Sequence, residues 1–123
     1  MNLAWVALGG AAGAVARYAA AGLVHRLAPP TFPWGTFVVN VAGSFVFGAL
    51  AGLMEQGFLS GPQVRLFVLI GVIGGFTTFS TFTFETFMLI RDGEFLRAGL
   101  NVFGQVVVSF LALWAGFTIA RLR

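Results

Sequence analysis

The most informative stretch of the sequence is Gly71–Val–Ile–Gly–Gly–Phe–Thr–Thr–Phe–Ser–Thr–Phe–Thr–Phe–Glu85. It lies inside a long apolar segment, yet six side-chain hydroxyls fall between Thr77 and Thr86, with phenylalanines interleaved among them. Glycine pairs such as Gly74–Gly75 weaken a helix, and irregular backbone at membrane depth is tolerated only where it is buried or lines a polar cavity. The stretch therefore predicts a transmembrane helix that is broken near Gly74–Gly75 and lines a path for a small ion.

The composition is that of an integral membrane protein. The 123 residues are 59% hydrophobic and 9% charged, with a mean hydropathy of +0.95, whereas a soluble domain carries about 25% charged residues. No cysteine is present, which excludes disulfides and thiolate metal sites. All seven basic residues are arginines, and this balance indicates contacts of helix ends with lipid headgroups, with no nucleic-acid partner.

Four apolar segments predict an all-α membrane protein with a single domain. We expect spans at residues 3–27, 34–54, 63–91 and 95–121, separated by a proline-rich loop, a polar loop and an Asp–Gly turn. The third span exceeds the ~20 residues needed to cross a bilayer, and the break accommodates the excess. No span contains a carboxylate pair or a metal-binding cluster, and His25 lies beside a loop, so we expect no enzyme activity.

Two of the predicted spans carry uncharged polar residues at i, i+4 and i+8, a spacing that places each set on one helix face. The sets are Thr36, Asn40 and Ser44 in the second span, and Asn101, Gln105 and Ser109 in the fourth. An amide in mid-membrane is costly unless it is hydrogen-bonded. Asn40 is therefore either a donor that faces a ligand or an interhelical hydrogen bond that only holds helices together.

The distribution of arginines bears on how the chain is assembled. Orientation follows the excess of Lys and Arg in cytoplasmic loops, but here each side of a four-span chain holds three arginines. These are Arg65, Arg121 and Arg123 on one side, and Arg26, Arg91 and Arg97 on the other. A chain without a preferred orientation can insert both ways, so we expect an antiparallel (dual-topology) homodimer. The alternative is a parallel dimer whose orientation is set by one residue near a loop.

The polar groups favour an anion as the transported ion. Cation carriers usually place a carboxylate at mid-membrane, whereas the first span holds Arg17 and the only acid in a span, Glu85, lies near the end of the third. Arg17 is either a cation at the wall of an anion path or a side chain that snorkels to the interface. Hydroxyl and amide groups can donate to an anion, and so can the positive ring edges of Phe79 and Phe82, which lie on one helix face. Lipid contact is the alternative for these rings.

Three motifs carry a resemblance that covers essentially the whole chain. They are Gly9–Gly–Ala–Ala–Gly–Ala–Val–Ala–Arg–Tyr18, Pro33–Trp–Gly–Thr–Phe–Val–Val–Asn–Val–Ala–Gly–Ser–Phe45 and Gly71–Val–Ile–Gly–Gly–Phe–Thr–Thr–Phe–Ser–Thr–Phe82. In this order they resemble the Fluc (also called CrcB) fluoride channels, which export fluoride across the bacterial cytoplasmic (inner) membrane. The resemblance implies a dual-topology homodimer with two antiparallel fluoride pores, embedded in the lipid bilayer.

The resemblance also implies roles for individual residues. The family's pore phenylalanines match Phe79 and Phe82, and its pore asparagine matches Asn40. Its hydroxyl track would include Ser80, Thr81 and Ser109, its pore-end acid matches Glu85, and its first-helix arginine matches Arg17. A structural sodium ion at the dimer centre, Na+, would be held by the backbone carbonyls of Gly74 and Thr77 from both subunits.

Two other functions are compatible with a short four-span chain. A proton-coupled exporter of small cations or drugs, similar to the small multidrug transporters, would also be dual-topology. Such exporters rely on an intramembrane glutamate in the first helix, and the first span here has none. A structural membrane subunit would have no need of two polar stripes and a hydroxyl-rich break. The sequence therefore favours a passive fluoride channel.

Overall fold

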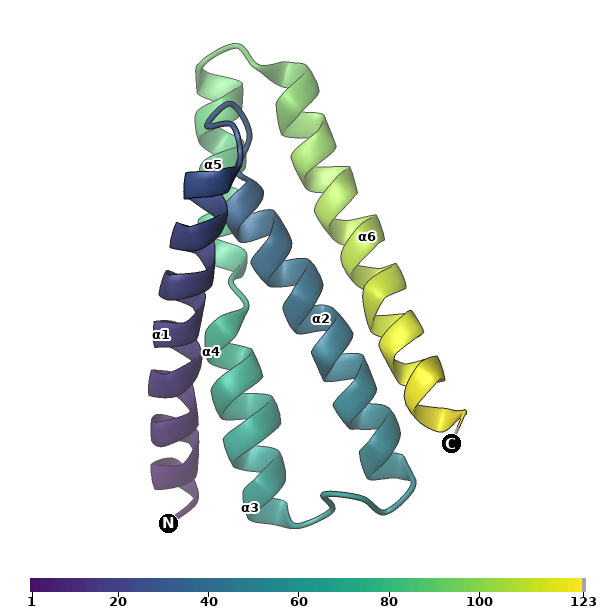
Figure 1. Ribbon diagram of the computed structural model, residues 1–123. Helices are drawn as coiled ribbons and strands as arrows, with labels where there is room; N and C mark the ends of the chain where they lie inside the picture. Colours follow the sequence, from purple (N-terminus) through teal and green to yellow (C-terminus); the bar gives the residue numbers. More distant parts are fainter. Residues whose placement is uncertain (123) are drawn as a thin grey trace.

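The structure, a computed structural model, describes residues 1–122, and this part of the chain forms helices joined by short loops (Figure 1). Three of the long helices are uninterrupted: α1 (Asn2–Leu27), α2 (Trp34–Glu55) and α6 (Phe95–Arg121). The remaining long segment, Pro62–Arg91, is composite. It contains α3 (Pro62–Arg65), the π-helical η1 (Leu66–Ile73), α4 (Gly74–Phe76) and α5 (Phe79–Arg91). The prediction of four long apolar helices, one of them interrupted, is confirmed.

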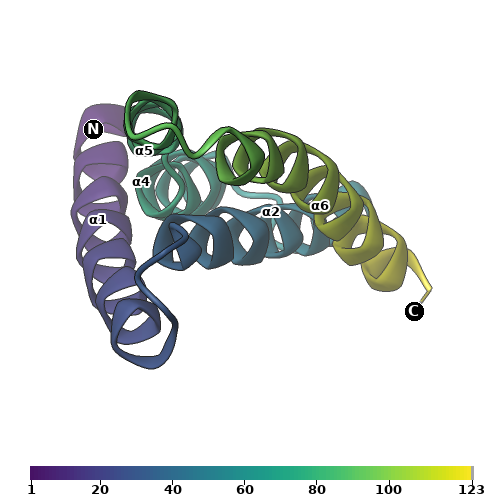
Figure 2. The same cartoon turned by 90° about the horizontal axis from the view of Figure 1, so that it is seen from above.

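The helices run up and down, so that loops and termini gather at two ends. Figure 1 shows both termini and the α2–α3 loop at one end, with the α1–α2 loop and the α5–α6 turn at the other. The view from above in Figure 2 shows α2 beside α6, and α1 beside α4. The molecule therefore consists of two helix pairs, α2 with α6 and α1 with the η1–α4 half of the composite segment, and α2 also contacts α1.

Glycines set the distance between the paired helices. A Cβ on Gly48 of α2 would collide with the carbonyl oxygen of Leu113, and one on Gly116 of α6 would collide with that of Phe45. In the other pair, a Cβ on Gly13 of α1 would collide with the carbonyl of Val72. Small residues let helix backbones approach closely in a bilayer, where van der Waals packing takes the place of the hydrophobic effect. These glycines therefore hold the two pairs together.

The composite segment is broken at Thr77 and Thr78. Both residues are extended, with φ −81° and ψ 157° at Thr77 and φ −148° and ψ 124° at Thr78. The side chain of Thr78 caps the new helix, because its Oγ1 accepts a hydrogen bond from the N–H of Thr81 at 3.3 Å. The segment thus becomes two helices, and between them the N–H and C=O of Thr78 bond to Asn40 instead of continuing the helix.

The position of the break differs from the one expected from the sequence. Gly74 and Gly75 are both helical, so the glycine pair does not itself form the break. Gly75 instead allows close helix packing, because a Cβ at this position would lie 2.7 Å from the carbonyl oxygen of Gly10 on α1. The chain leaves the helix only after this close approach, at Thr77.

Candidate functional site

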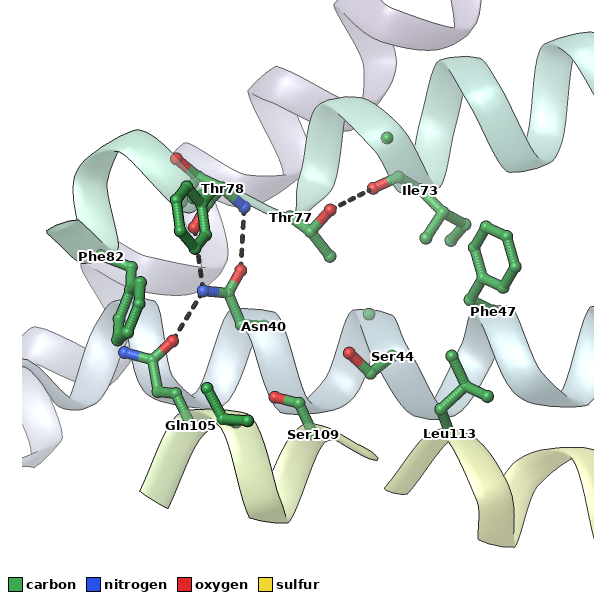
Figure 3. Close-up of a pocket in the computed structure, with 14 residues that line it drawn as sticks. Asn40, Ser44, Phe47, Ile73, Thr77, Thr78, Phe82, Gln105, Ser109 and Leu113 are labelled. Atoms are coloured by element: carbon green, nitrogen blue, oxygen red, sulfur yellow. Dashed lines mark hydrogen bonds between the residues drawn. The ribbon is translucent and has the colours of Figure 1, made fainter. Parts of the chain in front are cut away.

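A cavity of about 390 Å³ lies between α2, the break and α6; we call it the central cavity (Figure 3). Its polar lining residues are Asn40, Ser44, Thr77, Thr78, Gln105 and Ser109, and its aromatic ones are Phe47, Phe79 and Phe82. Four of the residues expected at a pore meet here, namely Asn40, Phe79, Phe82 and Ser109. Two residues of each polar stripe, together with Thr77 and Thr78 of the break, therefore face one space, whereas Thr36 and Asn101 do not line it.

Asn40 is fixed at the centre of this cavity by three hydrogen bonds (Figure 3). Its Nδ2 donates to the carbonyl oxygen of Thr78 at 3.0 Å and to Oε1 of Gln105 at 2.7 Å. Its Oδ1 accepts from the N–H of Thr78 at 2.8 Å. An amide has two N–H donors, and both are engaged, so Asn40 ties α2 to the break and to α6. Asn40 thus makes interhelical hydrogen bonds and also lines the central cavity.

A chain of side-chain hydrogen bonds continues from Gln105 toward the α5–α6 turn. Gln105 Nε2 donates to Asn101 Oδ1 at 2.8 Å, and Asn101 Nδ2 donates to Thr86 Oγ1 at 2.9 Å. Thr86 Oγ1 in turn donates to the carbonyl oxygen of Phe82 at 2.8 Å. Asn101 is completely buried and Gln105 is 4% exposed. In a bilayer these amides need such partners, and the chain positions α5 against α6.

Ser109 differs from the amides because its hydroxyl is left free. Its Oγ is buried and has no hydrogen-bond partner in the described part of the chain. A buried polar atom without a partner costs free energy and calls for a ligand, a water or an ion. Ser109 lines the central cavity together with Ser44 of α2 (Figure 3). The cavity thus offers hydroxyl donors that are not committed to the fold.

Phe79 and Phe82 form an aromatic pair at one side of the central cavity. Their ring centroids are 5.6 Å apart and the rings are tilted by 50°. Phe82 is 7% exposed, whereas Phe79 is 75% exposed although it lines the cavity. Tilted rings of this kind present positive edges as well as negative faces. Phe79 thus lines the cavity with most of its side chain exposed.

A second cavity of about 390 Å³ lies on the other side of α5, against α1; we call it the side cavity. Arg17, Thr81 and Glu85, which the sequence places in the pore, line this space and not the central one. Glu85 Oε1 accepts a hydrogen bond from Thr36 Oγ1 at 2.8 Å. Ser80 is exposed and lines neither cavity. The expected pore residues therefore divide between two cavities, and Thr78 borders both.

The break also frees two backbone carbonyls, those of Gly74 and Thr77. In a continuous helix these oxygens would accept from the N–H groups four residues on, which belong to Thr78 and Thr81. Here Thr78 N–H donates to Asn40 Oδ1 and Thr81 N–H donates to Thr78 Oγ1. Carbonyl oxygens released in this way are the ligands that hard cations prefer. The backbone at the break therefore fits the sodium site that the family resemblance implies.

Reasoning from the sequence left out two residues of the site. Thr78 caps α5, borders both cavities and exchanges two backbone hydrogen bonds with Asn40. Thr86 ends the chain of amides by binding Asn101. For Thr78 the signal is the Thr–x–x–Thr spacing at the break, which is typical of a helix N-cap. For Thr86 the only signal in the sequence is that it belongs to the cluster of six hydroxyl residues between Thr77 and Thr86.

Comparisons of the sequence with a family model and with known proteins all point to the same family. A sequence model described as "CrcB-like protein, Camphor Resistance (CrcB)" matches residues 4–117. A protein of Nitrosococcus oceani is 46% identical over 98% of this chain and 97% of its own length. One of Opitutus terrae is 51% identical over 94% and 89%, and one of Geobacter sulfurreducens is 48% identical over 94% of both. All three are named "Fluoride-specific ion channel FluC". The resemblance seen in the three motifs is confirmed, and the chain belongs to the CrcB family.

Proposed function

We propose that this integral protein of the bacterial inner membrane is a fluoride-specific passive ion channel, as its relatives are named. It is accordingly a transport protein and not an enzyme. The structural observation that carries the proposal is the buried hydroxyl of Ser109, which has no hydrogen-bond partner in the described part of the chain and lines the same cavity as the Phe79–Phe82 pair. This arrangement presents donors to an ion without presenting a negative charge.

The chemistry of the central cavity suits a small anion. Fluoride is strongly hydrated and gives up water only where donors replace it. Ser109 and Ser44 supply hydroxyl donors, and the ring edges of Phe79 and Phe82 add weak positive potential. Among the described residues that line this cavity there is no carboxylate to repel the ion. Donors without a full positive charge let an ion bind and still leave, as conduction requires.

Asn40 has a different part in this proposal from the one expected from the sequence. Because both its N–H groups are engaged, it acts by holding Thr78 and Gln105 in place rather than by solvating the ion directly. Gln105 donates to Asn101 through its Nε2, which leaves that nitrogen a second hydrogen on the cavity side. Asn40 is thus a positioning residue for the donors around it.

We propose further that two chains form an antiparallel, dual-topology homodimer with two pores. The balanced arginines supply no preferred orientation. The central cavity is open at Phe79, and α5 and α6 carry further exposed aromatic side chains, including Phe84, Phe103 and Phe110. A second copy that covers this side would close the cavity into a pore. A monomer would leave the ion path exposed to lipid.

A sodium ion at the dimer centre is the remaining part of the proposal. The carbonyls of Gly74 and Thr77 from each subunit would hold it. In the proposed dimer the two breaks would face each other, and the sodium charge would offset the partial negative charge of the carbonyl oxygens gathered there. The protein's own contribution is to divert the N–H groups of Thr78 and Thr81 to side chains, which leaves these carbonyls free.

The proposed function is tested by ion efflux from liposomes that contain the purified protein. A potassium ionophore clamps the voltage, no proton gradient is imposed, and fluoride and chloride are compared in parallel. We expect rapid efflux of fluoride and none of chloride. If fluoride leaves only after a proton gradient is applied, the protein is a coupled transporter, and the proposal is wrong.

A further inference from the structure

The central cavity is polar at one end and apolar at the other (Figure 3). Asn40 and Gln105 line the polar end, and Ser44 and Ser109 lie between the two ends. The other end, which we call the apolar end, is lined by one side chain from each of α2, η1 and α6, namely Phe47, Ile73 and Leu113. An ion that crosses the cavity therefore meets donors over part of its length and hydrocarbon over the rest.

The polar stripes of α2 and α6 both stop before the apolar end. On α6, the spacing of four residues that relates Gln105 to Ser109 leads next to Leu113, which is apolar. On α2, Phe47 follows Ser44 by three residues. At about 1.5 Å per residue, Leu113 lies about 6 Å beyond Ser109 along its helix, and Phe47 about 4.5 Å beyond Ser44. A hydrogen bond spans about 3 Å, so an ion level with Leu113 is out of reach of the Ser109 hydroxyl.

The polar groups that η1 and the break bring to this part of the cavity are already engaged in hydrogen bonds. The hydroxyl of Thr77 donates to the carbonyl oxygen of Ile73 at 3.1 Å. The N–H of Gly74 donates to carbonyl oxygens of its own helical segment. An anion at the apolar end would therefore lose water without gaining a donor from the described residues in return, and such a loss costs free energy.

The backbones of α2 and α6 touch at the level of the apolar end. A Cβ on Gly48, the residue after Phe47, would collide with the carbonyl oxygen of Leu113. Farther along α6, a Cβ on Gly116 would collide with the carbonyl oxygen of Phe45. An ion cannot pass between backbones in such contact, so a path out of this end runs over the side chains of Phe47 and Leu113. These side chains are 38% and 36% exposed, so both are accessible to an ion.

We propose that the apolar end is the barrier that limits the rate of fluoride conduction, and that Leu113 is the residue of α6 that sets it. The inference rests on the proposed function, because it concerns the ion path through the same central cavity. At this end fluoride exchanges hydroxyl donors for hydrocarbon, and hydrophobic constrictions are known to control conduction in pores by excluding water. One donor at Leu113 would extend the polar stripe of α6 by a turn and lower the barrier.

The test compares the fluoride currents of Leu113→Thr and Leu113→Val, measured with the full-length protein in planar bilayers. Both new side chains are β-branched and similar in shape, so the two variants open similar space and differ in one hydroxyl. Leu113→Asn, which brings two N–H donors, is a second polar variant. Chloride currents are recorded in parallel. The dimer content and the unfolding temperature of each preparation are measured so that the currents refer to equal amounts of folded protein.

We expect the fluoride current of Leu113→Thr to be about tenfold higher than that of Leu113→Val, because a hydrogen bond to a charged group is strong enough to change a rate by about this factor. Leu113→Asn should also exceed Leu113→Val. Chloride should stay excluded from all three variants, since the donors at Ser44 and Ser109 are unchanged. A gain in fluoride current that comes with a chloride current would indicate a wider pore and would count against the barrier.

Equal fluoride currents for the polar variants and Leu113→Val would overturn the inference, whether they lie at the wild-type level or above it, because the donor would then make no difference. If only one polar variant assembles, its comparison with Leu113→Val decides. In these cases the wild type still conducts fluoride, and the proposed function stands. A wild type that carries no fluoride current would instead refute the proposed function, and the inference with it. The two failures are therefore distinguishable in one set of recordings.

Discussion

The hydrogen bonds of Asn40 give the sharpest prediction about stability. Replacing Asn40 by Ala removes three bonds, two to Thr78 and one to Gln105. Side-chain hydrogen bonds between membrane helices average about 0.6 kcal/mol and reach about 1.7 kcal/mol. The substitution should therefore lower the free energy of unfolding by between about 2 and about 5 kcal/mol. Most of this loss should come from the break, where Thr78 loses the partners of both its N–H and its C=O.

A double-mutant cycle isolates the single bond from Asn40 to Gln105. Asn40→Ala, Gln105→Ala and the double mutant are unfolded in denaturing detergent at a fixed protein concentration. The coupling energy should be between about 0.6 and about 1.7 kcal/mol. Ser44→Ala with Ser109→Ala is the matched control on the same two helices, because Ser109 Oγ has no partner in the described part of the chain, and this pair should show no coupling. Additive effects for Asn40 and Gln105 would refute the network as described.

Three further predictions concern the pore, the packing and the sodium site. Phe79→Ile or Phe82→Ile should reduce fluoride efflux at least about tenfold, the change that about 1.4 kcal/mol makes, while Phe58→Ile, in the α2–α3 loop and outside the central and side cavities, should conduct normally. Wild-type efflux from both pore variants would show that the ring edges do not contribute to conduction. Gly116→Ala should lower the unfolding temperature because the new methyl group collides with the carbonyl oxygen of Phe45. Gly99→Ala is the control, because its methyl group enters open space and should leave the unfolding temperature unchanged. Equal unfolding temperatures for the two variants would contradict the helix packing described. The unfolding temperature of the dimer should rise with sodium at an ionic strength held constant with choline, and an unfolding temperature independent of sodium would rule out the bound ion.

The helical framework could be predicted from the sequence because its signals are local. Hydropathy defines four spans, and the prolines at 29, 30 and 33 end the first of them. The i, i+4, i+8 spacing of Asn40 with Thr36 and Ser44 likewise predicts a shared face. What spacing does not reveal is the rotation of one helix against another. The pairing of Asn40 with Gln105 across α2 and α6 depends on that rotation, which Gly48 and Gly116 set.

The exact position of the break could not be predicted from the sequence, because it depends on tertiary contacts. Glycines at 74 and 75 weaken a helix intrinsically, but both are helical here, and Gly75 packs closely against Gly10 of α1. The helix stops instead where side chains take its N–H groups: the N–H of Thr78 bonds to Asn40, on α2, and the N–H of Thr81 bonds to Thr78, the local cap of α5. A local propensity was thus overridden by contacts between residues far apart in the sequence. For the same reason the expected pore residues proved to line two cavities: on α5, Phe82 lines the central cavity beside α6, and Glu85, about one turn further on, lines the side cavity against α1.

The most direct test of the account is the reversal potential of the current under a fluoride gradient, with chloride as the other anion and with pH gradients of either direction. A fluoride-selective passive channel predicts a reversal potential at the fluoride equilibrium value, about 59 mV in magnitude for a tenfold gradient, unchanged by the pH gradient and by chloride. A potential that shifts with the pH gradient would show coupling to protons. One that shifts with chloride would show that the central cavity does not select fluoride. Either shift would contradict the account.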